Sequence, residues 1–234
     1  MKRYRSAMIM VMAALVAAMQ ACGGAGSCSG AKHERTDADT VRTPSTILSE
    51  LVAGNERFIS GTAHRKDLVH GQSPPAVILA CADSRVAPEI LFDEGLGELF
   101  VVRVAGNVAN AENIASIEYA IEHLGSSVVM VMGHESCGAI KAALTATSDD
   151  HGVTKDLAVL LNTIRSNITS GGGDMKTTPN DSRYRSQAIA NVRGVIEDLL
   201  AQSSLIAGAV RDGTVTLVPA IYALDTGRVS VLAE

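Results

Sequence analysis

The sequence predicts an α/β protein with a mainly parallel central sheet, flanking helices and a C-terminal edge strand and hairpin. Continuous apolar runs at residues 76–81, 99–105 and 127–133 are typical of strands that are covered on both faces, as in a parallel sheet. Residues 113–124, with apolar side chains at helical spacing, separate the second run from the third. Strands that alternate with helices indicate an α/β sheet, whose ligand sites lie at the carboxyl ends of the strands.

The ordered domain is expected to start near Thr43. Its first helix is marked by Ile47, Leu51 and Phe58, and Gly61 is expected to end it. The remaining predicted elements are helices at 138–146, 157–168 and 187–202, a loop at 170–174, strand segments at 214–217 and 220–224, a turn at 225–227 and a last strand at 229–232.

The first 21 residues are predicted to be a signal peptide of the lipoprotein type. Three of the first five residues are basic, and residues 7–18 form an uncharged apolar core too short for a comfortable membrane span. Ala21-Cys22 resembles a bacterial lipobox, in which Cys22 would carry the lipid. Ordinary cleavage nearby and an uncleaved anchor are the alternatives. We therefore expect an exported protein of the periplasm or cell envelope, attached to the membrane only through its N-terminal anchor.

Residues 22–42 are expected to form a flexible tether, because Gly, Ser, Ala, Thr and charged residues dominate their composition. Cys28 lies in this tether and is assigned no function. The domain that remains, residues 43–234, is long enough for a substantial core.

The charge balance gives no indication of a nucleic-acid partner. The chain has 20 Lys and Arg against 25 Asp and Glu, and removal of the signal peptide leaves 17 basic residues and a net charge of −8. Without a basic patch, binding to nucleic acid is not expected.

Three candidate metal ligands follow the first and third apolar runs. Cys81 ends the first run, and His134 and Cys137 follow the third. Two Cys and one His form a three-ligand zinc set that leaves one tetrahedral position for water, which favours a catalytic over a structural site. Two alternatives remain open: Cys81 as a buried structural thiol and, in an exported chain, a disulfide between Cys81 and Cys137.

The two stretches resemble the motifs of the β-class carbonic anhydrases. Cys81-Ala82-Asp83-Ser84-Arg85 matches the family's C-x-D-x-R motif, and His134-Glu135-Ser136-Cys137 matches its H-x-x-C motif. The resemblance runs from about Thr43 to the C-terminus, with further landmarks at 54–58, 71–74, 100–103 and 221–227. It implies one zinc ion per chain, bound by Cys81, His134 and Cys137. The implied activity is reversible hydration of carbon dioxide to bicarbonate and a proton, by attack of zinc-bound hydroxide on CO2.

The resemblance also implies roles for Asp83 and Arg85. Asp83 would accept a hydrogen bond from the hydroxide and orient it, while Arg85 keeps this carboxylate ionised. In some members of the family the same Asp ligates zinc and blocks the water, so Asp83 is also a possible fourth ligand in a closed form. A surface ion pair without a catalytic role is the alternative.

Four further residues resemble parts of the family's substrate pocket. Gln72 would bind a substrate oxygen through its amide, Phe100 and Tyr119 would line the pocket, and Gly138 would direct a backbone N–H toward the substrate. In the family, the neighbouring subunit supplies part of this pocket, which implies a homodimer, often paired into a tetramer. For Phe100 and Tyr119, ordinary core packing is an equal alternative.

Two departures from the family pattern concern the pocket. Residues 103–107 read Arg-Val-Ala-Gly-Asn where many relatives have Arg-Asn-x-Ala-Asn. The chain has no Trp, so the allosteric site of the bicarbonate-inhibited subgroup is at best incomplete. Two other functions are weighed: hydrolysis of CS2 or COS on the same fold, and a non-catalytic zinc-binding scaffold. Retention of the ligands together with Asp83, Arg85 and Gln72 argues against the scaffold.

Overall fold

The computed structural model describes residues 52, 55, 58–60, 68–146, 152–176 and 183–233. The chain divides into two compact units, residues 1–69 and residues 70–234. In the first unit, residues 52, 55 and 58–60 are helical, within the helix that was expected to end at Gly61. The predicted signal peptide and tether lie outside the described residues. No described helix is both long enough and apolar enough to cross a membrane.

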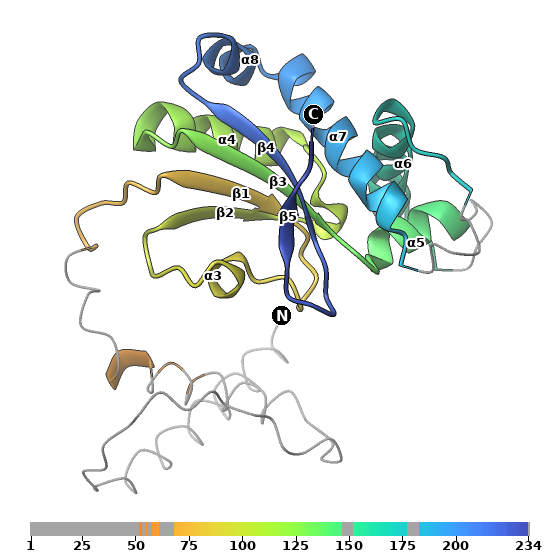
Figure 1. Ribbon diagram of the computed structural model, residues 1–234, viewed down its shortest axis with the longest axis horizontal. Helices are drawn as coiled ribbons and strands as arrows, with labels where there is room; N and C mark the ends of the chain where they lie inside the picture. Colours follow the sequence, from red (N-terminus) through yellow and green to blue (C-terminus); the bar gives the residue numbers. More distant parts are fainter. Residues whose placement is uncertain are drawn as a thin grey trace, which may run out of the picture. The chain divides into compact units, whose positions relative to one another are not determined.

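The second unit is built on one five-stranded sheet with the order β2-β1-β3-β4-β5 (Figure 1). Its strands are β1 (Ala76–Ala80), β2 (Leu99–Arg103), β3 (Val128–His134), β4 (Thr216–Tyr222) and β5 (Val229–Val231). The first four strands are parallel, and β5 pairs antiparallel with β4 at the edge. The predicted fold class is therefore confirmed.

Two helices of this unit, α4 (Ala111–Leu124) and α6 (Lys155–Ser170), begin at a capping side chain. The Asn110 side chain caps α4 by accepting a hydrogen bond from the Asn113 N–H, and Gly125 ends the helix with a φ of +77°. Thr154 caps α6 in the same way as Asn110 caps α4. The described helices are α3 (Pro88–Leu91), the 3-10 helix η3 (Ala105–Asn107), α4 (Ala111–Leu124), α5 (Gly138–Thr145), α6 (Lys155–Ser170), α7 (Arg185–Gln202) and α8 (Ser204–Arg211).

The end of the chain corrects the sequence prediction. One continuous strand, β4, replaces the two segments expected at 214–217 and 220–224. The Pro219 carbonyl accepts a hydrogen bond from the Leu232 N–H at 2.9 Å, so this side of the residue faces the chain of the edge strand. In a strand, the nitrogen of a residue points to the same side as its carbonyl oxygen. Proline has no N–H, so Pro219 lacks a donor only on the side of the edge strand, and the ladder between β3 and β4 remains intact.

Helices α3 and α8 were not predicted. Ser203 caps α8 by accepting a hydrogen bond from the Ile206 N–H at 3.0 Å, and Ile206 is fully buried. A polar cap before an apolar stretch was the available signal. Helix α3 has only four residues, and Pro88 in its first turn was its only clear signal.

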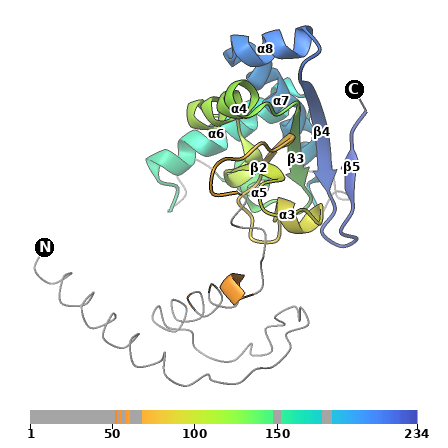
Figure 2. The same ribbon diagram turned by 90° about the vertical axis from the view of Figure 1, so that its left-hand side faces the viewer.

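Alternate residues of the strands face two different apolar layers. Val77 and Leu79 of β1, with Val129 and Val131 of β3, pack against α4, α7 and α8, which gather on one side of the sheet (Figure 2). The other face carries Ile78, Ala80, Met132 and Ala220 with partly buried residues of α3 and β5. Both faces are therefore covered, as the continuous apolar runs predicted.

A third apolar cluster surrounds the carboxyl ends of β1 and β3. It contains Cys81 and Cys137 together with Ile140 of α5 and Leu161 and Ile164 of α6. Packing from these two helices thus fixes the position of both candidate sulfur ligands.

Candidate metal centre

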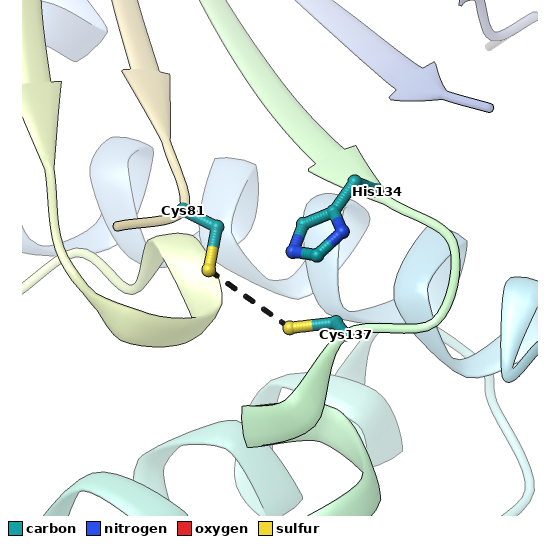
Figure 3. Close-up of side chains that lie close together, drawn as sticks. All are labelled: Cys81, His134 and Cys137. Carbon is teal, nitrogen blue, oxygen red and sulfur yellow. Dashed lines mark hydrogen bonds between the residues drawn. The ribbon is translucent and has the colours of Figure 1, made fainter. Parts of the chain in front are cut away.

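The three predicted metal ligands come together at the carboxyl edge of the sheet. Cys81 follows β1, His134 ends β3, and Cys137 is the N-cap residue of α5. One ligand atom from each lies within 4.8 Å of the others, and all three residues are buried. Figure 3 shows the two sulfur atoms and the imidazole ring converging on one another.

The distance between the sulfur atoms argues against a disulfide. Cys81 Sγ and Cys137 Sγ are 4.0 Å apart, and both cysteines are free. A disulfide requires about 2.05 Å, whereas two thiolates bound to one tetrahedral zinc at about 2.3 Å lie a little under 4 Å apart. The spacing therefore fits a shared metal ion.

The tautomer of His134 leaves one ring nitrogen for a metal. Nδ1 lies 2.8 Å from the Glu135 carbonyl oxygen, which only accepts hydrogen bonds, so Nδ1 carries the proton. Nε2 is buried and has no hydrogen-bond partner among the described residues. A histidine that donates one N–H to a backbone carbonyl and leaves the other nitrogen unpaired has the arrangement of a metal ligand.

Neighbouring groups shift the pKa values of the two thiols in opposite directions. The pKa of Cys81 is lowered, mainly by the hydrogen bond with Cys137 and further by the hydrogen bond from the Gly106 N–H. The proximity of Cys81 and burial raise the pKa of Cys137. Both sulfur atoms would have to lose their protons to hold a metal ion, so metal binding at this site would release protons.

Gly106 gives Cys81 a backbone hydrogen bond that other residues would disturb. Its N–H lies 3.3 Å from Cys81 Sγ. Its φ is +70°, and an added Cβ would lie 2.6 Å from Cδ1 of Ile164. The left-handed backbone conformation favours glycine here, and any other residue would also have to displace the end of the Ile164 side chain.

Asp83 and Arg85 form a bidentate pair beside the ligands. Arg85 Nε donates to Asp83 Oδ1 at 2.8 Å, and Arg85 Nη2 donates to Oδ2 at 2.7 Å. These bonds hold the pKa of Asp83 well below its usual range. Oδ2 lies 3.9 Å from His134 Nε2. Arg85 thus engages both carboxylate oxygens, and Asp83 lies beside the three candidate ligands without belonging to their group.

Two other residues near the ligands were not assigned roles from the sequence. Arg103 donates from Nε to the Cys81 carbonyl at 3.1 Å and from Nη2 to the Asp83 carbonyl at 2.7 Å, which braces the turn after β1. Glu135 is buried, with 5% of its surface exposed. In the sequence, Glu135 was distinguished only as an acidic residue within a motif that follows a buried strand.

The single chain does not bring Gln72, Phe100 and Tyr119 to the metal ligands. Gln72 is exposed and precedes β1, whereas Cys81 follows β1, so the strand of about 16 Å separates them. Phe100 pairs with Val77 near the amino end of the sheet, and its ring centroid lies 6.5 Å from that of Tyr119. These three residues therefore belong to the opposite end of the sheet.

Gly138 does lie beside the ligands. It is the first residue of α5, directly after Cys137, and it is exposed. An added Cβ would meet nothing within 4 Å, so open space adjoins this position.

Together these features define an α/β protein with three candidate metal ligands at the carboxyl edge of a parallel sheet. Comparison with known proteins identifies the family. The profile of the family described as "Carbonic anhydrase" matches residues 76–229, more than half of the chain. The chain belongs to this family, and within it to the β class; it is a carbonic anhydrase enzyme.

Similar proteins come from bacteria and fungi. "Carbonic anhydrase 2" of Mycobacterium tuberculosis is 38% identical over 196 residues, covering 79% of this chain and 91% of that protein. A carbonic anhydrase of Mycolicibacterium smegmatis is 35% identical, covering 80% and 93%. Among solved structures, the β-carbonic anhydrase CafA of Aspergillus fumigatus superposes with a TM-score of 0.70 at 25% identity, covering 80% of this chain and 92% of that one.

Proposed function

We propose that this chain catalyses the reversible hydration of carbon dioxide to bicarbonate and a proton at a zinc ion held by Cys81, His134 and Cys137. The observation that carries the proposal is the buried His134 Nε2, which has no partner among the described residues and lies with the two sulfur atoms. Membership of the carbonic anhydrase family supports the reaction. The Cys and His donor set is one that zinc prefers.

The chain's own residues would supply orientation and charge. When bound, zinc would supply a water molecule whose pKa it lowers toward about 7. Asp83 would accept a hydrogen bond from the attacking oxygen and orient its lone pair. Arg85 would keep Asp83 ionised, since its guanidinium engages both carboxylate oxygens. The backbone N–H of Gly138, next to open space, would face the substrate.

Stopped-flow measurement of CO2 hydration, with zinc content determined on the same sample, tests this proposal. We expect about one zinc per chain and hydration that is lost when zinc is removed and regained when zinc is restored. Zinc-free protein that hydrates CO2 at the same rate would contradict the assignment of the metal site.

We also propose that the active unit is at least a dimer. Gln72, Phe100 and Tyr119 lie at the amino end of the sheet, too far from the ligands of their own chain to complete its pocket. A second copy would bring these residues to the metal centre of its neighbour. Tetrameric β-carbonic anhydrases from Sordaria macrospora offer a precedent: one is 25% identical with a TM-score of 0.65, covering 80% of this chain and 95% of that one.

For the location of the protein, we propose export and a lipid anchor at Cys22. The basic N-terminus, the short apolar core and Ala21-Cys22 support this proposal. Cys22→Ala should release the protein from the membrane fraction or leave it unprocessed, while CO2 hydration per zinc is unchanged. Cell fractionation with N-terminal sequencing tests it, and Cys28→Ser is the matched control. A wild-type protein found soluble in the periplasm with another N-terminus would contradict lipidation but not export.

A further inference from the structure

The backbone between His134 and Cys137 is bound to two other parts of the fold. The Glu135 N–H donates to the Tyr222 carbonyl at the end of β4 at 3.0 Å, and the Ser136 N–H donates to the Arg183 carbonyl at 2.7 Å. Ser136 has a φ of +55°, in the left-handed region that non-glycine residues rarely adopt. Such a conformation persists only where its surroundings enforce it. Residues 135 and 136 are thus held in a shape that the chain would not adopt alone.

The Glu135 side chain adds a buried ionic contact to this loop. Arg185 Nη1 donates to its Oε1 at 2.6 Å, and Arg183 Nη1 donates to its Oε2 at 3.2 Å. The carboxylate is 7% exposed, while the arginines are about half exposed. Arg183 also pairs with Asp225, in the turn between β4 and β5. Glu135, Arg183 and Arg185, which we call the Glu135 clamp, tie the loop to the start of α7.

Stability alone is a weak reason to keep such a cluster. Removing a carboxylate from water is unfavourable, and apolar side chains of similar volume often replace a buried ion pair without loss of stability. The clamp also lies where position matters most to the metal centre: the Glu135 carbonyl accepts the His134 Nδ1 proton and so determines which ring nitrogen is left for a metal.

We propose that the Glu135 clamp is a positioning device for the metal centre. By fixing the Glu135 peptide and the left-handed Ser136, it holds His134 in the tautomer and orientation that a metal requires, and it holds Cys137 at the right distance. Loss of the clamp should loosen these ligands and speed metal release. This inference rests on the proposed zinc site.

The experiment compares full-length holoprotein with the variants Glu135→Gln, Arg185→Gln and the double variant. The rate of zinc transfer to a chromophoric chelator is the first measurement. The visible absorption spectrum of the cobalt-substituted protein, which reports ligand geometry, is the second, and thermal unfolding of the apoprotein is the third. Arg211→Gln, which removes an exposed ion pair with Asp212 on α8, is the matched control.

Both single variants should release zinc about tenfold faster or more, as is usual when a partner of a metal ligand is lost. Their cobalt spectra should change. The double variant should behave like the single variants, because each of the three variants disrupts the same Glu135 clamp. Arg211→Gln should behave as wild type. Glu135→Gln changes a buried side chain and could fold poorly. Arg185→Gln changes a more exposed side chain of the same clamp, so its zinc release and cobalt spectrum still test the proposal.

Three results would overturn parts of this account. If the acidic and basic variants shift zinc release in opposite directions, the cluster acts through charge and not through position. If both lower apoprotein stability but leave zinc release and the cobalt spectrum unchanged, its role is only structural. If wild-type protein binds no zinc, the proposed function itself fails, and the clamp inference fails with it.

Discussion

The two ends of the sheet differ in how complete they are within one chain. At the carboxyl end, Cys81, His134 and Cys137 are buried, and hydrogen bonds from Gly106 and to Glu135 fix the first two. At the amino end, Gln72 is exposed and Tyr119 is 49% exposed. On the proposed dimer, each chain would hold the metal with its own residues, and the partner would complete the pocket.

Cys81→Ser should have the largest effect, because it removes a ligand that the carboxyl end cannot replace. We expect loss of most zinc and of nearly all CO2 hydration, since the weaker oxygen donor leaves a two-ligand site. Metal analysis and stopped-flow assay on one preparation measure both. Cys28→Ser is the matched cysteine control and should keep full zinc and activity. Normal zinc content in Cys81→Ser would show that the metal lies elsewhere.

Asp83→Asn should separate chemistry from metal binding at the same end. The amide cannot accept the hydrogen bonds of Arg85 and of the attacking oxygen in the same way, so we expect activity to fall about 100-fold or more. Zinc content should stay at the wild-type level, because Asp83 lies outside the ligand group. The exposed Asp212→Asn is the control. Near-normal kcat/KM at neutral pH would refute the role of Asp83.

The amino end is tested by mixing subunits. Gln72→Ala should retain zinc and lose about tenfold in kcat/KM, the value of about one hydrogen bond. If the pocket is shared, coexpression with Asp83→Asn forms heterodimers in which one site has its own Asp83 and the partner's Gln72. Activity should then recover to about a quarter of wild type, the share of intact sites in random dimers.

The matched control for this experiment mixes Asp83→Asn with Cys81→Ser. Both changes lie at the carboxyl end, so no heterodimer contains an intact site, and activity should not recover. If the Gln72→Ala mixture also gives only the mean of its parents, each chain builds its pocket alone or Gln72 has no role.

The sequence predicted the carboxyl end better than the amino end for a physical reason. Cys81 and His134 end two buried apolar runs, and adjacent parallel strands necessarily bring such residues together at one edge. Gln72 precedes the first apolar run and Phe100 lies at the start of the second, so both belong to the amino end of a parallel sheet. The local pattern could not show which metal centre these residues serve, because that depends on a neighbouring chain. The hydrogen bonds of Arg103 and of the Glu135 clamp were not predicted either, because they join residues about 20 to 50 positions apart in the sequence.

Gly138→Ala should have the smallest effect. It tests whether substrate reaches the carboxyl end of the sheet through the open space beside Gly138. Because the added methyl group meets nothing within 4 Å and the backbone is helical, the fold and zinc content should be unchanged. Stability should rise by about 0.4–1 kcal/mol, as for other compatible Gly→Ala changes. If substrate uses the open space beside Cys137, the methyl group should lower kcat/KM by up to about tenfold.

Gly208→Ala in α8 is the matched helical control, and its kcat/KM should stay at the wild-type value. Should Gly138→Ala also retain full kcat/KM, substrate must approach the metal centre from another side, and the proposed contact with the Gly138 N–H would have to be abandoned.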